Sequence, residues 1–208
     1  MPQHAVLVGT GALPGELIVP ASATGLIVFV HGSGSSRASP RNRRVAESLQ
    51  LRHLATLLFD LLREDEAQDR QRVFDIALLA DRLLQALAWA RSRTDVAALP
   101  IGLFGASTGA AAALVAAAER PQQVGAVVSR GGRPDLAGAA LGQLRSPTLL
   151  IVGAHDTEVL ALNRDAMRQM VCEKRLEIVP RATHLFEEAG AMDRVSALAG
   201  DWFMSKLT

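Results

Sequence analysis

Short segments that are apolar throughout alternate along the chain with longer segments whose apolar residues recur at helical spacing. A continuous apolar run is typical of a strand that is buried on both faces, as in a parallel sheet. Such runs predict strands within residues 24–31, 54–61, 99–104, 124–128, 146–153 and 176–180. Two further runs, 5–8 and 16–19, are joined by a turn with glycine and proline, and they predict an antiparallel hairpin at the start.

Helical spacing of apolar residues is clearest over 69–93, and it extends also over 110–119, 159–171 and 189–206. Strands that alternate with helices imply a mostly parallel sheet with helices on both faces. The predicted fold class is therefore α/β, with residues 1–208 in one domain, because no repeat or linker interrupts the pattern. We expect the charge-rich stretch 60–71 to be a solvated loop that leads into a helix.

Composition narrows the class of protein. A chain of 208 residues, of which 49% are hydrophobic, is long enough to bury a substantial core. No uncharged apolar run reaches the roughly 18 residues that suggest a membrane span, and a net charge of +1 gives no general case for nucleic-acid binding. We see no signal peptide at the start, and Cys172 is the only cysteine, so we expect a cytoplasmic protein.

The most informative motif is the pentapeptide 105–109, Gly-Ala-Ser-Thr-Gly, which stands between a predicted strand and an alanine-rich helix. It fits the G-x-S-x-G elbow, in which a sharp turn exposes the serine hydroxyl at the end of a sheet. The helix behind it directs free N–H groups to the same place, which favours negative charge there. A turn of small residues can also serve only to pack a helix closely on a sheet. Residues elsewhere in the chain are therefore needed to distinguish a nucleophile from a packing turn.

A serine nucleophile needs a base, and the base needs an orienting group. In enzymes with this elbow the chain order is serine, acid, histidine. Ser107, Asp156 and His184 occur in that order, each just past a predicted strand, and they form the predicted catalytic triad. The alternatives are a helix N-cap for Asp156 and a solvated loop position for His184. Glu158 is a fallback for the acid, and we interpret His155 as a loop residue.

The oxyanion of an acyl-transfer reaction needs hydrogen-bond donors. One usual donor is the N–H of the residue after the nucleophile, here Thr108, and a second comes from a loop after an earlier strand. Gly32 and Gly34 frame such a loop, and we predict Ser33 as the second donor, with Gly34 as the alternative. A phosphate-binding loop is excluded, because no Lys-Ser or Lys-Thr follows at the required spacing.

These motifs resemble an α/β-hydrolase of the dienelactone hydrolase-like group, through residues 31–36, 105–109, 153–156 and 182–184. Segments 36–43 and 129–135 are similar to a small branch of that group. The resemblance covers nearly the whole chain, and it implies an α/β-hydrolase fold with a mostly parallel central sheet. Dienelactone hydrolases proper use a cysteine nucleophile, whereas this elbow carries Ser107, and the departure favours ordinary ester chemistry.

Arginines gather just past two predicted strand ends, on the rim where the triad is expected: Arg37, Arg41, Arg43, Arg44, Arg130 and Arg133. One account is that they cap carbonyls and pair with acids such as Asp60 and Asp135. The other is that Arg37 or Arg133 binds an anionic group of the substrate, because a guanidinium matches a carboxylate in a bidentate fork. In the second account the protein would resemble dienelactone hydrolases, which act on carboxylate-bearing substrates.

We therefore expect a serine esterase for small carboxylic esters that uses no metal or organic cofactor and is a monomer or homodimer. An acyltransferase or perhydrolase with the same triad, or a binding protein that has lost catalysis, are the alternatives. A DNA-contacting or scaffolding role has only the arginine-rich stretch in its favour. Residues 130–145 are too few for a cap domain, so the site should be shallow and open, with little apolar area for long acyl chains.

Overall fold

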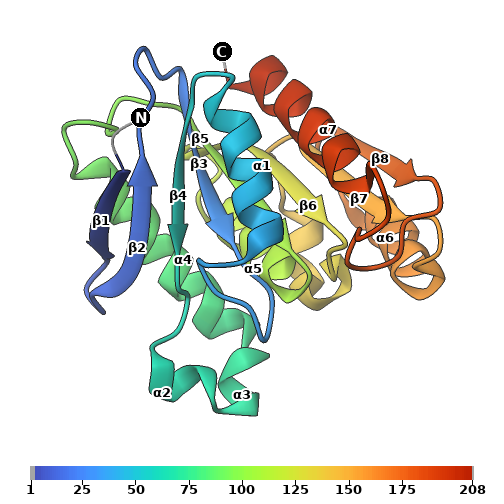
Figure 1. Ribbon diagram of the computed structural model, residues 1–208. Helices are drawn as coiled ribbons and strands as arrows, with labels where there is room; N and C mark the ends of the chain where they lie inside the picture. The colour runs from blue at the N-terminus through green and yellow to red at the C-terminus, as the bar shows by residue number, and fades with distance from the viewer. Residues whose placement is uncertain (1–2, 208) are drawn as a thin grey trace.

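The computed structural model describes residues 3–207, and its eight strands form one sheet in the order β1-β2-β4-β3-β5-β6-β7-β8 (Figure 1). The strands are β1 (Gln3–Val8), β2 (Leu13–Ile18), β3 (Gly25–Val30), β4 (Leu54–Phe59), β5 (Ile101–Ala106), β6 (Val124–Arg130), β7 (Thr148–Gly153) and β8 (Lys174–Val179). β1 pairs antiparallel with β2, and β2 with β4. The pairs from β4 to β8 are all parallel. The predicted hairpin and the mostly parallel sheet are thus confirmed.

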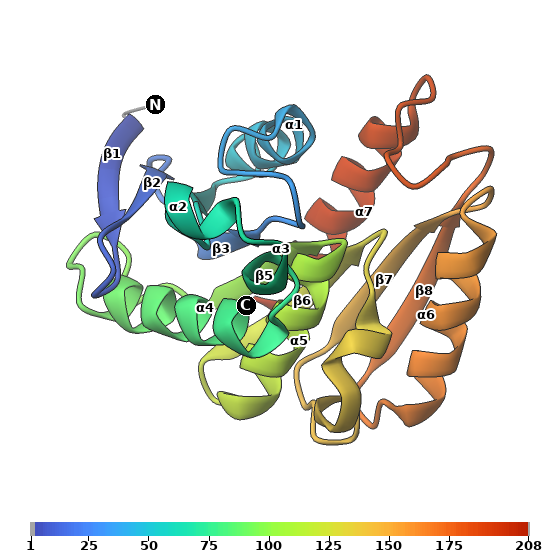
Figure 2. The same ribbon diagram turned by 90° about the horizontal axis from the view of Figure 1, so that it is seen from below.

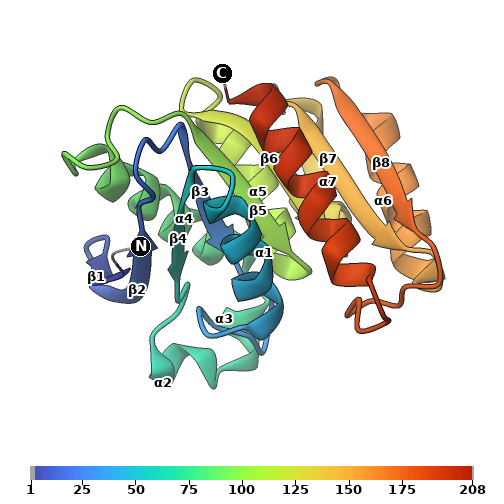
Figure 3. The ribbon, with the colours of Figure 1, turned by 45° about the horizontal axis from the view of Figure 1, so that its top comes forward.

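Helices cover both faces of the sheet (Figure 2). α1 (Pro40–Gln50) and α7 (Ala191–Lys206) lie on one face, and α4 (Ile76–Arg91), α5 (Thr108–Glu119) and α6 (Thr157–Gln169) lie on the other. Two short helices, α2 (Glu64–Ala67) and α3 (Arg70–Val73), lie beyond the carboxyl end of β4 (Figure 3). The connection from β6 to β7 contains only the 3₁₀ segment η1 (Pro134–Gly142).

The two-sided cover explains the continuous apolar runs. Along β3, Leu26, Val28 and Val30 belong to the buried cluster that includes side chains of α4 and α5. Ile27 and Phe29 belong to the cluster on the other face, with side chains of α1 and α7. Since neighbouring residues of a strand point to opposite faces, every position of β3 is apolar. Each such side chain contributes about 1.5–3 kcal/mol when it is fully buried.

The predicted helix over 69–93 is wrong in its first part. α3 ends at Val73 and α4 begins at Ile76, so two helices occupy the segment. The carboxylates of Asp69 and Asp75 accept hydrogen bonds from the N–H groups of Gln71 and Leu78, at 2.8 and 3.0 Å. Aspartate at such a position starts a helix, because it satisfies an N–H that has no partner within the helix. The apolar periodicity continues across this break and does not reveal it.

The stretch 60–71 also differs from the predicted solvated loop. Glu66 is only 3% exposed, and its carboxylate accepts hydrogen bonds from the guanidinium groups of Arg72 and Arg82 at 3.0 and 3.1 Å. The Arg63 guanidinium lies 3.2 Å from the same oxygen, and the Arg63 N–H donates to the other oxygen at 3.0 Å. Glu66 therefore fastens α2 to α3 and α4.

Strand order decides where a site can form. β3 lies beside β5 in the sheet, although the chain leaves β3 toward β4, on its other side. At such a switch of direction the loops beyond the carboxyl ends of the strands diverge and leave a crevice. The loops that follow β3 and β5 are those with the glycine-serine segment and the G-x-S-x-G elbow.

Candidate active site

Ser107 occupies the sharp turn between β5 and α5. Its backbone angles are φ 51° and ψ −124°, a conformation that costs a residue with a side chain roughly 1–3 kcal/mol. The turn is held by its neighbours: the Ser107 N–H donates to the Arg130 carbonyl at 3.3 Å, and the Ser107 carbonyl accepts from Ala110 and Arg133, both at 3.1 Å. The backbone therefore has the geometry that presents a nucleophile at the end of a sheet.

Two glycines let the loop after β3 lie directly on this turn. A Cβ at Gly109 would stand 2.3 Å from the carbonyl oxygens of Val30 and His31, and a Cβ at Gly32 would stand 2.9 Å from the Ser107 Cβ. A rotation about a side-chain bond cannot relieve contacts this short, because the atoms involved are backbone atoms and a Cβ atom. The small residues of the two motifs are therefore required by the close approach of the two loops.

His184 and Asp156 meet just beyond the ends of β7 and β8. His184 Nδ1 lies 2.7 Å from Asp156 Oδ2. Since a carboxylate accepts, Nδ1 carries the proton and leaves the Nε2 lone pair free to take one. Asp156 stands at the N-cap position of α6, yet its side chain makes no capping hydrogen bond. The carboxylate serves His184 and not the helix.

The loop that carries His184 is held by Glu188. The N–H and hydroxyl of Thr183 both donate to Glu188 Oε1, at 2.9 and 2.6 Å. The hydrogen bond from the Thr183 side chain lowers the pKa of the Glu188 carboxyl. These bonds fix the residue next to His184.

Ser107 and His184 line one cavity of about 220 Å³. Its other lining residues include Arg41 and Asn42 of α1 and Arg130 at the end of β6. The structure thus brings all three residues of the predicted triad to one edge of the sheet. Their catalytic roles remain predictions.

The predicted oxyanion donors contact each other. The N–H of Ser33 donates to the hydroxyl oxygen of Thr108 at 2.9 Å. Gly34, the alternative donor, has a φ of +67° that favours glycine. Both predicted donors therefore lie at the elbow, but the Ser33 N–H already has an acceptor, and their oxyanion role stays a prediction.

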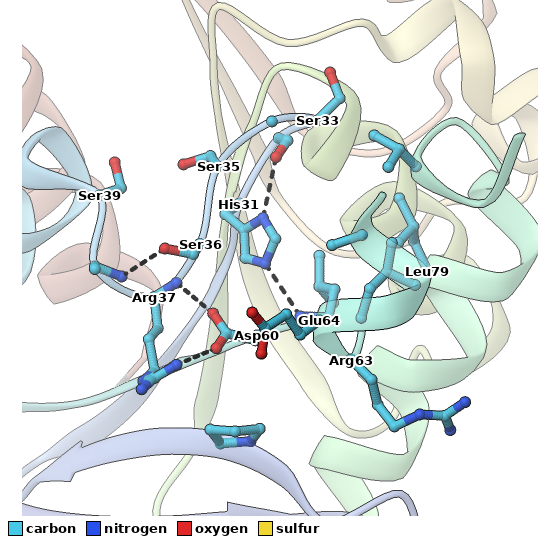
Figure 4. A pocket seen from close by; sticks show the side chains of 18 of the residues that line it. His31, Ser33, Ser35, Ser36, Arg37, Ser39, Asp60, Arg63, Glu64 and Leu79 are labelled. Atoms are coloured by element: carbon cyan, nitrogen blue, oxygen red, sulfur yellow. Dashed lines mark hydrogen bonds and ion pairs between the residues drawn. The ribbon is translucent and has the colours of Figure 1, made fainter. Parts of the chain in front are cut away.

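His31 connects the same loop to the segment that follows β4. Its Nε2 accepts a hydrogen bond from the Leu61 N–H at 3.1 Å, so its Nδ1 carries the proton and donates to the Gly32 carbonyl at 3.0 Å. Burial lowers the pKa of His31, against smaller opposing effects of the Gly32 hydrogen bond and the Asp60 charge. A neutral imidazole thus holds the glycine-serine loop in place (Figure 4).

Arg37 and Arg133, the two arginines predicted to bind substrate, are paired with acids. The Arg37 guanidinium forms an ion pair with Asp60, whose other oxygen accepts from the Arg37 N–H at 2.7 Å (Figure 4). Arg133 forms a bidentate pair with Asp135, at 2.9 and 2.7 Å, and this bonding raises the pKa of Arg133. The account in which these arginines pair with Asp60 and Asp135 is therefore confirmed, and their role in substrate binding stays a prediction.

A larger cavity of about 850 Å³ adjoins the first and shares part of its lining, from Gly32 to Arg41 (Figure 4). Its apolar lining includes Leu61, Leu62 and Leu79. The sequence predicts a shallow, open site because no cap can lie between β6 and β7. That connection is indeed short, but the segment between β4 and α4 supplies a wall that we did not expect.

A family model, the dienelactone hydrolase family, matches residues 43–202. The chain belongs to the dienelactone hydrolase family. A solved structure of a dienelactone hydrolase from Anabaena variabilis is 56% identical, with a TM-score of 0.96 over the whole of this chain and 99% of that one. Est1E from Butyrivibrio proteoclasticus has a TM-score of 0.81 over 99% of this chain and 98% of its own, at 15% identity, which shows a shared fold alone.

A longer protein also contains a segment that is similar to this chain. A Mycobacterium tuberculosis protein named "Putative phosphoribosyl transferase" is 54% identical to this chain over 202 residues. The match covers 97% of this chain and 46% of that protein, so the chain spans about half the length of the curated relatives it matches. The family and the dienelactone hydrolase structure from Anabaena variabilis support a hydrolase.

Neither a metal centre nor a membrane segment is found in the part of the chain that the structure describes. Residues 3–207 contain no group of three or more His, Cys, Asp or Glu side chains placed to hold a metal ion. None of the helices within these residues is long and apolar enough to cross a membrane.

Sequence reasoning did not assign a role to Arg130, Asn42, His31 or Glu66. Arg130 carries the clearest signal, because a charged residue directly ends an apolar strand beside the nucleophile strand, in register with Ala106. His31 similarly ends the run of β3. Glu66 carries no such signal, because it lies within a run of acidic residues that looks solvated.

Proposed function

We propose that the protein is a serine hydrolase that cleaves small carboxylic esters through an acyl-enzyme. The observation that carries the proposal is that Ser107, in its strained turn, lines the same cavity as His184, which is hydrogen-bonded to Asp156. A serine on a strained turn alone can be a packing device. A serine that shares a cavity with a histidine held by a carboxylate has the parts of a nucleophile and its base.

In the proposed reaction Ser107 Oγ attacks the ester carbonyl, and His184 Nε2 takes the hydroxyl proton. Asp156 stabilises the imidazolium through the Nδ1–H bond. The tetrahedral intermediate collapses as His184 gives the proton to the departing alkoxide, which leaves as the alcohol. Water then attacks the acyl-enzyme by the same route and releases the acid and free Ser107. Amides at the elbow, those of Thr108 and Ser33, bind the oxyanion in both steps.

The test is hydrolysis of p-nitrophenyl esters by the wild type and two variants. Ser107→Ala should abolish hydrolysis, and it should retain most of the stability because the serine side chain is small. Asp156→Asn should lower kcat by up to about 10⁴-fold, since the amide can favour the wrong tautomer of His184. Glu158→Gln is the matched control, and it should leave kcat unchanged. Full activity of Ser107→Ala would refute the mechanism.

Two measurements separate the alternatives that share this site. A burst of p-nitrophenol with one equivalent per enzyme distinguishes acyl-enzyme formation from a binding protein without catalysis. Adding an alcohol or hydrogen peroxide during turnover tests transfer, because an acyltransferase or perhydrolase would divert most of the acyl group from water to that acceptor.

The name phosphoribosyl transferase, which belongs to the longer relative, gives no activity for this chain. That name describes proteins of which this chain covers 46%. The residues that meet at the Ser107 cavity are those of acyl transfer, and we assign only that reaction to this chain.

A further inference from the structure

Arg130 differs from the other arginines of the rim. Arg37, Arg41, Arg43, Arg44 and Arg133 each pair with a carboxylate. Within residues 3–207, no carboxylate pairs with Arg130, and its Nε is buried without a hydrogen-bond partner. The residue is nevertheless buried, with an exposed fraction of only 7%.

A buried cation without a counter-ion is costly. Desolvation, with a smaller contribution from the nearby charge of Arg41, lowers the pKa of Arg130 to about 10. The guanidinium carbon lies 5.7 Å from the centre of the Phe186 ring, a contact that offsets part of this cost. Such a cation is usually paired or bonded in a folded protein, so an anion that reached it would recover much of the lost interaction.

The position of Arg130 shows where that anion would sit. Arg130 is the last residue of β6, in register with Ala106, the residue before the nucleophile. It lines the cavity of Ser107 and His184. An anionic group bound there would therefore belong to the molecule whose ester bond Ser107 attacks.

The same cavity holds a further donor with unused capacity. The Nε of Arg41 is buried and has no hydrogen-bond partner. The amide oxygen of Asn42 is also buried without a partner, but it is an acceptor and adds nothing to the binding of an anion. Arg41 does pair with Glu187 at 3.3 Å, but the Glu187 side chain is 67% exposed and such a pair is weak. Two guanidinium groups thus reach one cavity from separate elements, β6 and α1.

This arrangement favours a doubly charged tetrahedral anion. One carboxylate is satisfied by a single guanidinium through a bidentate pair. A phosphate monoester carries a charge of about −1.5 to −2 at pH 7 and three acceptor oxygens, so it can neutralise and bond two guanidinium groups at once. We propose that Arg130, with Arg41, binds a phosphate group carried by the ester substrate. This inference rests on the proposed function and specifies its substrate class.

The volumes of the two cavities fit a substrate that places a small group in one cavity and the rest of the molecule in the other. The cavity of about 220 Å³ is smaller than a typical ligand pocket and has space for a small group beside the nucleophile. The adjoining cavity of about 850 Å³ can hold the rest of the molecule. The phosphate would then lie near the carbonyl, on the Arg130 side.

Binding of inorganic phosphate tests the subsite without turnover. Calorimetry on the wild type should detect phosphate binding, and Arg130→Met should weaken it by about 10- to 100-fold, the loss for hydrogen bonds to a charged group. Arg41→Met should also weaken binding, and it provides a second variant should Arg130→Met fail to fold. Arg52→Met, which removes a partly exposed arginine paired with Asp201, is the matched control and should bind phosphate as the wild type does.

Competition connects the subsite to the reaction. Phosphate should inhibit hydrolysis of p-nitrophenyl acetate competitively in the wild type, and acetate, a monocarboxylate probe, should inhibit at least tenfold less. No phosphate binding, equal binding by Arg130→Met, or tighter binding of acetate would overturn the proposal. Phosphate binding by a protein without esterase activity would leave the subsite standing and refute the proposed function, so the two failures are distinguishable.

Discussion

The Glu66 cluster predicts a large effect from a single conservative change. Glu66→Gln keeps the size of the side chain and removes the charge that Arg63, Arg72 and Arg82 share. The three arginines differ in exposure. The side chains of Arg63 and Arg72 are about half exposed, at 50% and 48%, whereas that of Arg82 is 13% exposed.

The loss of stability expected for Glu66→Gln follows from this difference in exposure. Exposed pairs contribute about 0–1 kcal/mol each, so losing the bonds to Arg63 and Arg72 costs little. Removing one partner of a buried pair costs about 3–5 kcal/mol, because the other charge is left without compensation. Arg82 is not fully buried, so we expect the lower end, a loss of about 3 kcal/mol. For a chain of this length that corresponds to a fall in Tm of roughly 6–12 °C.

The assay is urea unfolding of Glu66→Gln beside Asp65→Asn. Asp65 is the neighbouring acid, it also pairs with Arg63, and its side chain is 73% exposed. Its substitution should leave the free energy of unfolding close to that of the wild type. If the two variants lose the same stability, the argument from burial is wrong. Glu66→Gln should also reduce kcat/KM for bulky esters more than for acetate, because α2 and α3 line the larger cavity.

Two further predictions concern the loop after β3. The pKa of His31 is lowered in the folded state, so the unfolded chain binds a proton first as the pH falls below 6.5. Stability should therefore decline below that pH, by up to about 1.4 kcal/mol per pH unit. Urea unfolding between about pH 5 and 7.5 should show this decline in the wild type and a smaller one in His31→Gln. Gly109→Ala should cost about 3 kcal/mol, because the new Cβ would stand 2.3 Å from two backbone carbonyl oxygens. Gly142→Ala is the control, and it should be neutral or slightly stabilising, because no atom lies within 4 Å of the new Cβ. Equal melting temperatures of these two variants would contradict the steric argument.

The fold could be predicted from the sequence where a pattern has one physical cause. A strand such as β3 must be apolar at every position, because side chains from both of its faces are buried under helices. Glycine at positions 32 and 109 is likewise required by the approach of one loop to another. Where two causes give the same pattern, the prediction was wrong: the apolar periodicity of 69–93 fits one helix, and only the capping bonds of Asp69 and Asp75 show that there are two.

Charged residues were the least predictable part of the site. The place of Arg130 at the end of an apolar run is visible in the sequence, but its lack of a carboxylate partner among the described residues is not, and neither is the pairing of Arg37 with Asp60. Pairing depends on which loops meet in space: Asp60 is 3 residues from Arg63 in the sequence, yet it pairs with Arg37, which is 23 residues away. Sequence order placed the arginines on the correct rim, but their partners follow from tertiary contacts.

The contact between Ser33 and Thr108 has a consequence for the proposed mechanism. In the resting site the Ser33 N–H donates to the Thr108 hydroxyl, so it can bind an oxyanion only by exchanging acceptors. A neutral hydrogen bond contributes about 1 kcal/mol net, and one to a charged acceptor about 1.5–3 kcal/mol. The neutral ester carbonyl would therefore not displace the hydroxyl, whereas the oxyanion would. Such a donor stabilises the transition state more than the bound ester, and this difference in binding is what accelerates a reaction.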